Sequence, residues 1–435
     1  MKKKLFVLSM DAMVHEDVAY MEKKPNFKRI MEKRAEVERV CSVYPASTYP
    51  AHTTLMTGCY PGKHGVYSNF QLQTAPDGIA HWPTDSSYVF AEDLFAAAKR
   101  AGCTTAAVYW PITAGNPNID HVINEYFFYY PGEKDRVEEI FAAQGADEVA
   151  LQAVRENLRY FPGGKAPVTE LFDDFIMGCA CSLIRNVQPD VLLVHNCLVD
   201  TMRHRGGVFG SHIAEALDRM DAWLGNVLDA MERAGVLEQT DFVILSDHGQ
   251  MDVIRSVQVN VLLRQGGFLS VAPNDTLYTW QAYAQSNGIS AAVYLRDPGN
   301  RKLYDRVYAY LLQLQKTGKY GIETVLTGEM LAERYGQRGP FSFMLEAEPG
   351  TEFGGRWIGE PVSLRPADKP RGAHGNMPEK GPQPIFLAHG PSFRAGAVVP
   401  RAKLVDVAPT LAAVLGQKLT EADGSVLTEL FETFS

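Results

Sequence analysis

The fold follows from one short stretch, Phe242-Val243-Ile244-Leu245-Ser246-Asp247-His248-Gly249. Its apolar part is continuous rather than alternating, which is typical of a strand buried on both faces of a parallel sheet. Four other runs share this character, namely Leu5–Met10, Thr105–Trp110, Val191–His195 and Ile385–Ala388. Helical periodicity separates them, most clearly between His212 and Ala234. The alternation predicts an α/β fold whose mostly parallel central sheet carries helices on both faces.

Acidic and imidazole side chains collect where these runs end. Asp11 closes the run Leu5–Met10, Asp247 and His248 close Phe242–Ser246, and Asp200 lies just beyond Val191–His195. Ligands of such sheets bind outside the carboxyl ends of the strands. We therefore expect the active site at this edge.

The segment 252–370 is less regular than the rest and contains Gly- and Pro-rich stretches. Tyr304–Leu314 has a helical pattern and Ser290–Leu295 resembles a strand. We interpret 252–370 as an inserted cap or subdomain, and residues 1–251 together with 371–435 as the catalytic core.

Composition excludes several classes of protein. The 435 residues carry a net charge of −9, which disfavours stable nucleic-acid binding through clustered Lys and Arg. The negative net charge does not argue against a small phosphorylated substrate, because bound metal ions can reverse the local electric field. No apolar stretch reaches the ~20 residues of a membrane span, and six cysteines without a CxxC pair indicate a reducing compartment. We expect a cytoplasmic protein; the oligomeric state is left open.

Three motifs carry residues that bind transition metals. Asp200 and His204 are four residues apart and share one face of a helix. Asp247 and His248 stand side by side at a strand end, and His374 lies between glycines in a Pro-rich loop. Each motif alone is typical of a surface pair, a turn or a solvated loop. Together with Asp11 they supply three carboxylates and three imidazoles, a ligand set suited to two zinc-like ions.

The stretch from Tyr44 to Val66 carries a family resemblance. Thr48-Tyr49-Pro50 is followed by Thr57-Gly58, Pro61 and His64-Gly65. This pattern resembles the nucleophile region of the nucleotide pyrophosphatase/phosphodiesterase branch of the alkaline phosphatase superfamily. The motifs at Asp11, Asp200/His204, Asp247/His248 and His374 then follow in the order of that family.

The resemblance implies a fold and a set of roles. The fold is an alkaline-phosphatase-like sheet with an inserted cap. Thr48 is the implied nucleophile, forming a phospho-threonine intermediate, and Asn69 is the implied donor to a phosphoryl oxygen. Two Zn²⁺ ions, or other divalent transition metals, are implied as cofactors. Asp11, Thr48, Asp247 and His248 would bind one ion, and the other would have as ligands Asp200, His204 and His374.

The substrate side is less defined by sequence. Tyr49 matches one of the two aromatic positions that stack on a base in nucleotide-cleaving members, but the second position is His195. Trp110 and the aromatic run 126–130 are further candidates for the leaving-group side. His52 and His64 are expected to be structural. A small phosphoester or nucleotide is the expected substrate.

Several alternatives share this fold. No CxPxR motif surrounds Thr48, which argues against a sulfatase, and no Arg follows Thr48 to grip a monoester dianion. Because Asn69 is neutral, we expect diesters or pyrophosphates to be preferred. A phosphonate hydrolase of the phosphonoacetate type is the runner-up, and a phosphomonoesterase using Arg205 stays open. A non-catalytic binding protein is disfavoured by the complete ligand set.

Overall fold

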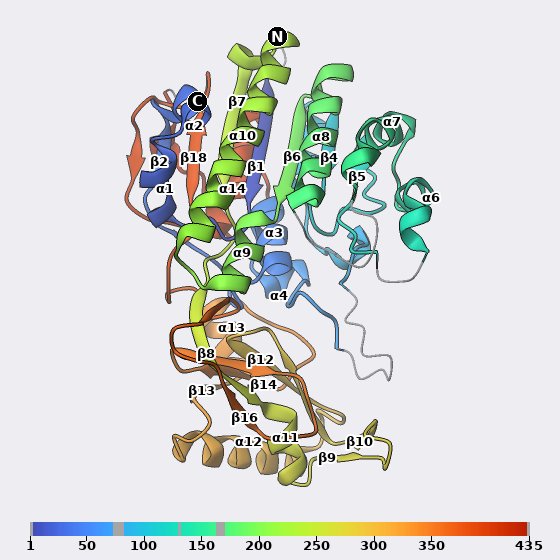
Figure 1. The fold of residues 1–435 in the computed structure, drawn as a ribbon, viewed down its shortest axis with the longest axis vertical. Coiled ribbons are helices and arrows are strands. Elements are labelled where there is room, and N and C mark those ends of the chain that lie inside the picture. Colours follow the sequence, from blue (N-terminus) through green and yellow to red (C-terminus); the bar gives the residue numbers. More distant parts are fainter. Residues whose placement is uncertain (1–2, 73–81, 129–131, 162–169, 433–435) are drawn as a thin grey trace.

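The computed structural model describes residues 3–72, 82–128, 132–161 and 170–432, and it has two parts, one above the other in Figure 1. The upper part is built on a sheet with the strand order β19-β2-β18-β7-β1-β6-β4-β5. The bounds of these strands, in chain order, are β1 Lys4–Met10, β2 Ala35–Val37, β4 Thr105–Val108, β5 His121–Ile123, β6 Val191–Asn196, β7 Thr240–Leu245, β18 Phe386–His389 and β19 Val398–Val399.

The centre of this sheet is parallel, as the sequence predicts. β1 pairs in parallel with both β6 and β7, and β4 pairs in parallel with β6 and β5. The run Ile385–Ala388 was expected to join as another parallel strand, and here the expectation is wrong. β18 runs antiparallel to β7, with Phe386 opposite Leu245. The chain leaves β7 and returns to β18 at the same end of the sheet, so an antiparallel pair results.

Side chains alternate along β1 between two hydrophobic clusters. Phe6, Leu8 and Met10 face one cluster, whereas Leu5 and Val7 face the other. Helices cover the first face, namely α1 His15–Met21, α2 Pro25–Met31, α8 Glu170–Asn186, α9 Leu198–Gly206 and α10 Ser211–Arg233. Those over the second face are α3 Thr48–Thr57, α5 Leu94–Arg100 and α14 Val407–Val414. Burial of both faces accounts for the continuous apolar strands in the sequence.

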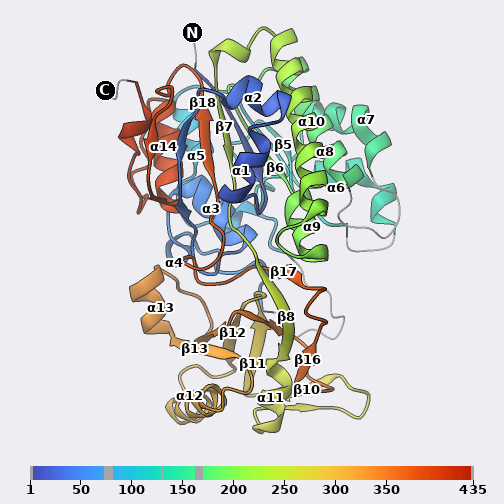
Figure 2. The same cartoon turned by 60° about the vertical axis from the view of Figure 1, so that its left-hand side comes forward.

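The lower part, which we call the insertion, comprises residues 251–373. It enters through β8 Met251–Gln258 and leaves through β17 Arg371–Ala373, which pairs antiparallel with β8 (Figure 2). One hydrophobic cluster takes all of its buried members from residues 253–373. The other strands and helices are β9 Leu269–Val271, β10 Leu277–Trp280, β11 Ala282–Ser286, β12 Ser290–Leu295, β13 Ile322–Thr327, β14 Phe343–Ala347, β15 Gly350–Gly354, β16 Val362–Leu364, α11 Val259–Gln265, α12 Arg301–Lys316 and α13 Gly328–Tyr335.

The strands of the insertion form an antiparallel sheet of order β11-β12-β14-β13, while β15, β16 and β17 pair with β8. The helix expected over Tyr304–Leu314 is longer at both ends. It begins earlier because Asn300 caps it by accepting a hydrogen bond from the Leu303 N–H. Among the described residues, no helix combines the length and the apolar character that crossing a membrane requires.

Candidate active site

Strand order brings the predicted ligands together. β1 lies between β7 and β6, and in this register Ser9 is opposite Leu245 while Met10 is opposite Asn196. Asp11 therefore emerges beside the Asp247–His248 turn and near the start of α9, which carries Asp200 and His204. His374 arrives from the insertion, directly after β17.

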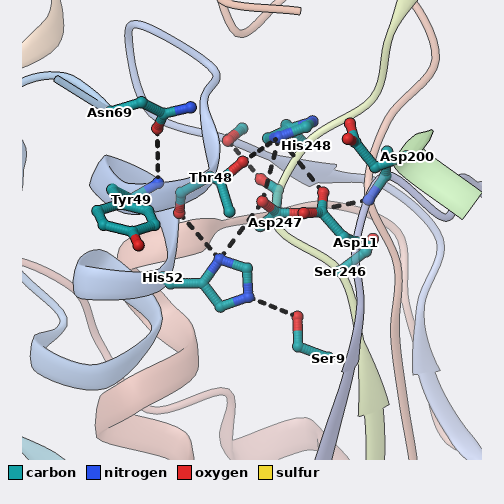
Figure 3. A network of polar contacts seen from close by, with 12 residues as sticks. Ser9, Asp11, Thr48, Tyr49, His52, Asn69, Asp200, Ser246, Asp247 and His248 are labelled. Atoms are coloured by element: carbon teal, nitrogen blue, oxygen red, sulfur yellow. Dashed lines mark hydrogen bonds and ion pairs between the residues drawn. The ribbon is translucent and has the colours of Figure 1, made fainter. Parts of the chain in front are cut away.

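The first group of ligands surrounds Nε2 of His248 (Figure 3). This nitrogen lies 3.2 Å from Oδ2 of Asp247, 3.5 Å from Oδ1 of Asp11 and 3.3 Å from Oγ1 of Thr48. The other ring nitrogen, Nδ1, is 3.1 Å from the carbonyl oxygen of Gly249. That bond places an N–H at Nδ1, so in the neutral ring Nε2 presents a lone pair toward the two carboxylates.

These converging lone pairs fit a cation. Oδ1 of Asp11 and Oδ2 of Asp247 are both buried and have no hydrogen-bond partner. Both oxygens lie within 3.5 Å of Nε2 of His248, and acceptor atoms gathered in this way repel one another unless a positive charge lies between them. Burial, followed by the charges of Asp247 and Asp200, raises the pKa of Asp11 well above its usual value. A divalent ion would remove that penalty.

The second group consists of Asp200, His204 and His374, whose ligand atoms lie within 4.8 Å of one another. Nε2 of His204 is 3.4 Å from Oδ1 of Asp200, and its Nδ1 is 2.9 Å from the carbonyl oxygen of Gly372. Nδ1 of His374 is buried without a hydrogen-bond partner. Burial, and then the charges of His248 and His204, hold the pKa of His374 well below its usual value, which keeps the ring in its neutral, metal-binding form.

The two groups adjoin. The rings of His248 and His374 stack with centroids 4.3 Å apart, and Asp11, Asp200 and His248 also place ligand atoms within 4.8 Å of one another. All seven residues predicted as ligands are thus brought to one place, and their donor types suit two neighbouring divalent ions.

Thr48 is the first residue of α3, whose free N–H groups and dipole favour negative charge at this end. Asn69 lies beside it and is 6% exposed. Its Oδ1 accepts a hydrogen bond of 2.8 Å from the Tyr49 N–H, so its amide nitrogen faces the other way (Figure 3). This nitrogen points toward the cavity that Thr48 and Asn69 both line. This arrangement can donate to an anionic oxygen bound near Thr48.

Two further histidines contact the carboxylates of Asp11 and Asp247. His195 Nε2 is 3.2 Å from Oδ2 of Asp11, and His52 Nδ1 is 3.4 Å from Oδ2 of Asp247. Their rings pack at 4.2 Å, and His52 also contacts Ser9 Oγ at 2.8 Å. His52 is structural, as expected, although its partners include a side chain of the site as well as the backbone.

The three side chains expected to contact substrate lie behind the cavity wall. His195 and Tyr49 are fully buried, Trp110 is 1% exposed, and none of the three lines the cavity. His195 is instead bonded to Asp11, Tyr49 packs on Trp82, and Trp110 packs on His52. The sequence pattern correctly placed these residues near Thr48, but it did not predict the direction in which their side chains point.

A cavity of about 850 Å³ opens over Thr48 between the core and the insertion. Its aromatic wall contains Phe70, Trp82, Phe127 and Phe353. Trp82 packs on both Phe70 and Phe127, with ring centroids 4.7 Å and 4.9 Å apart. Sequence reasoning missed Phe70, Trp82 and Phe353, while Phe127 belongs to the aromatic run singled out in the sequence. Tyr129 and Tyr130 of that run lie outside the described residues.

Basic residues also line the cavity. Arg205 follows the ligand His204, and Arg356 and Arg371 come from the insertion. Arg203 points away from the cavity, because its guanidinium is buried against Asp17 and the carbonyl oxygen of Ala12. The sequence offered no signal for Arg356, which approaches only through the fold of the insertion.

Comparisons with known proteins show which proteins this chain resembles. The human ectonucleotide pyrophosphatase/phosphodiesterase family member 1 is 22% identical over 213 residues, which are 48% of this chain and 19% of that protein. The bis(5'-adenosyl)-triphosphatase of Xenopus laevis is 22% identical over 418 residues, which are 95% of this chain and 78% of that protein. The matched part is 33% of a Saccharomyces cerevisiae relative and 44% of a Schizosaccharomyces pombe relative, so the chain spans less than half of several relatives.

Solved structures share the fold. Murine ectonucleotide pyrophosphatase/phosphodiesterase 5 superimposes with a TM-score of 0.64 at 20% identity, covering 97% of this chain and 98% of that one. The human protein of the same name gives 0.67 at 19% identity, covering 99% and 100%. The family described as type I phosphodiesterase / nucleotide pyrophosphatase matches residues 5–377. The alkaline-phosphatase-like fold expected from the sequence is therefore confirmed, and the chain belongs to the type I phosphodiesterase / nucleotide pyrophosphatase family.

Proposed function

We propose that the chain hydrolyses phosphodiesters or pyrophosphates, with nucleotides as the substrate class, through a phospho-threonine intermediate at Thr48. The observation that carries the proposal is the position of the Thr48 hydroxyl. It begins a helix, lies 3.3 Å from Nε2 of His248, and lines the same cavity as Asp11 and the second ligand group.

Asp11, Thr48, Asp247 and His248 would hold one divalent ion, and Asp200, His204 and His374 would hold the other. Zinc suits the mixture of imidazole and carboxylate ligands. When bound, such ions act as Lewis acids that lower the pKa of a neighbouring hydroxyl and neutralise phosphate charge.

The chain's own groups account for the remaining steps. Thr48 Oγ1 forms a bond to phosphorus while the bond from phosphorus to the leaving oxygen breaks; the hydroxyl proton passes to solvent, and the leaving group takes a proton from solvent. The amide nitrogen of Asn69 donates to a phosphoryl oxygen during this exchange. A water molecule then cleaves the phospho-threonine ester and restores the hydroxyl.

Nucleotides are supported as substrates by two relatives and by the cavity itself. An inactive Thr→Ala variant of murine ectonucleotide pyrophosphatase/phosphodiesterase 5 has been solved in complex with AMP, and the Xenopus relative is named for bis(5'-adenosyl)-triphosphate. In the present chain, Phe70, Trp82 and Phe127 offer aromatic faces on which a base can stack.

A phosphomonoesterase is the second candidate, because Arg205 and Arg356 line the cavity and could offset the extra charge of a monoester. The neutral donor Asn69 beside Thr48 favours the diester. Specificity constants, kcat/KM, for a matched nitrophenyl phosphodiester and monoester decide between them, with the zinc-loaded protein as enzyme. If the monoester is preferred by about tenfold or more, equivalent to roughly 1.4 kcal/mol in transition-state binding, the diester assignment is wrong.

The nucleophile is tested by Thr48→Ala. We expect turnover to fall by at least roughly 100-fold, because no other group supplies the attacking oxygen. Thr57→Ala is the matched control: Thr57 ends the same helix, and its hydroxyl bonds only to backbone groups. Residual activity above about 1% of wild type, with metal content intact, would indicate direct attack by water instead.

A further inference from the structure

We propose that Glu346 of the insertion is a positioning residue that holds both the segment before Thr48 and the segment after His374. The inference rests on the two-metal function proposed above. It assigns to the insertion a role in shaping the metal centre, in addition to forming a wall of the cavity.

Glu346 lies on β14 and is fully buried. Its Oε2 accepts a hydrogen bond of 3.0 Å from the Tyr44 hydroxyl, and its Oε1 accepts one of 3.0 Å from the Met377 N–H. Tyr44 precedes Thr48 by four residues, and Met377 follows His374 by three. One carboxylate of the insertion thus bonds to both catalytic segments.

Backbone contacts join the same segments. The Gly375 N–H donates to the Ala46 carbonyl oxygen at 2.7 Å, and the Ala46 N–H donates to the Asn376 carbonyl oxygen at 3.2 Å. The insertion reaches the ligand directly as well, because the Ile289 N–H donates to the carbonyl oxygen of His374 at 2.8 Å. The Thr48 and His374 segments and the insertion therefore form one hydrogen-bonded unit.

The approach of the insertion to His374 is close. At Gly288, which has a φ of +92°, an added Cβ would lie 2.4 Å from the His374 carbonyl oxygen, so glycine is required on steric as well as conformational grounds. A displacement of the insertion would consequently displace the ligand. Because the insertion packs so closely against the His374 backbone, the two would move together.

A buried carboxylate at this position is not explained by stability. Part of its surroundings is apolar, because Tyr44 and Met377, which donate hydrogen bonds to it, belong to one hydrophobic cluster. Lys380 lies 3.1 Å from Oε1 and also bonds to Glu323 at 2.6 Å, so the charge is partnered. Apolar side chains of similar volume fill such sites at equal or lower free energy, whereas a bonded carboxylate fixes geometry. A role in positioning accounts for its presence.

The test uses Glu346→Gln, which keeps the shape of the side chain and removes its charge. Zn²⁺ is titrated into metal-free protein against a chelator, and kcat and KM are measured separately on the metal-saturated enzyme. We expect the affinity for the ion that His374 would bind to fall by roughly 10- to 100-fold, as for partners that orient ligands, and the affinity for the other ion to fall less, because that ion keeps Asp11, Asp247 and His248. We also expect kcat to be reduced and KM to be nearly unchanged. Glu348→Gln is the control, because Glu348 pairs with Arg255, away from both catalytic segments.

Zinc affinities and kcat of Glu346→Gln within about twofold of wild type would overturn the proposal. So would an equal loss at both sites together with a lowered melting temperature, which is the signature of a purely structural residue. If Glu346→Gln does not fold, Tyr44→Phe decides: it removes a single hydroxyl, and an unchanged kcat in that folded variant overturns the proposal. A wild-type protein that binds no second ion would instead refute the function on which the inference rests.

Discussion

Asp173→Asn is expected to stabilise the protein at neutral pH. Asp173 lies on α8 and is fully buried; its Oδ1 accepts a hydrogen bond of 3.0 Å from the Cys197 N–H, and its Oδ2 has no hydrogen-bond partner. Burial raises the pKa of this carboxyl to about 7 from an ordinary value of 3.8, against the opposing effect of the Cys197 N–H. The folded protein therefore binds this proton more tightly than the unfolded chain does.

The sign and the size of the effect on the free energy of unfolding follow from this difference in proton affinity. For a group whose pKa is raised on folding, the stabilisation is fully present below the unfolded value and is lost as pH rises through the folded one. Between about pH 5 and pH 8, this group should reduce the free energy of unfolding by roughly 3 kcal/mol, an upper limit for a relaxing interior. Asparagine resembles the protonated carboxyl and does not titrate, so the variant should lack this loss.

The assay is urea unfolding of wild type and Asp173→Asn at several pH values in that range. The gap between the two free energies of unfolding should widen in favour of the variant as pH rises; any constant effect of the new amide cancels. Asp218→Asn is the control, because the Lys24 ammonium lowers the pKa of Asp218, so this carboxyl is charged in both states across that range and the gap for this variant should stay flat. A gap that stays flat with pH would refute the reasoning, since it would mean that Asp173 is charged in the folded protein.

Two further predictions concern the site. His374→Ala should remove the ion that Asp200, His204 and His374 would bind, whereas the other ion keeps Asp11, Asp247 and His248. Metal analysis after dialysis that finds both ions retained would contradict this ligand assignment. Trp82→Ala should raise KM for an aromatic phosphodiester by roughly three- to tenfold with little change in kcat, as expected for the loss of one stacking face; Tyr278→Ala, an exposed aromatic on β10, serves as the control, and an unchanged KM would show that the aromatic group binds elsewhere.

The grouping of the candidate ligands could be predicted from sequence because each lies in or directly after a recognisable element. Asp11 and Asp247 end strands whose continuous apolar character marks them as central, and His204 is one helical turn from Asp200. Parallel strands bring these ends to one edge of the sheet, and the adjacency of β6, β1 and β7 brings the side chains together there. The direction of β18 could not be predicted, because an apolar run contains no information about which way it crosses the sheet.

The substrate side of the site escaped prediction for a different reason. Trp82 and Arg356 reach the cavity through irregular connections, and neither belongs to a motif with fixed spacing. His195 was at the expected position in the chain, yet its side chain turns inward to Asp11. Which way a side chain at a strand end points depends on its neighbours in space, and those are set by the tertiary fold.

The pairing of β8 with β17 has a consequence for how such proteins diversify. The chain enters and leaves the insertion through adjacent strands, with Arg371 opposite Val253, and the candidate ligand His374 follows directly after β17. Another insertion grafted at these two strands would meet the core at the same two points, so a new cavity wall could be acquired in a single recombination event. Any such replacement must supply its own partners for Tyr44 and Met377. The junction of β8 and β17 therefore allows the cavity wall, and with it the substrate range, to change while the proposed metal ligands of the core stay the same.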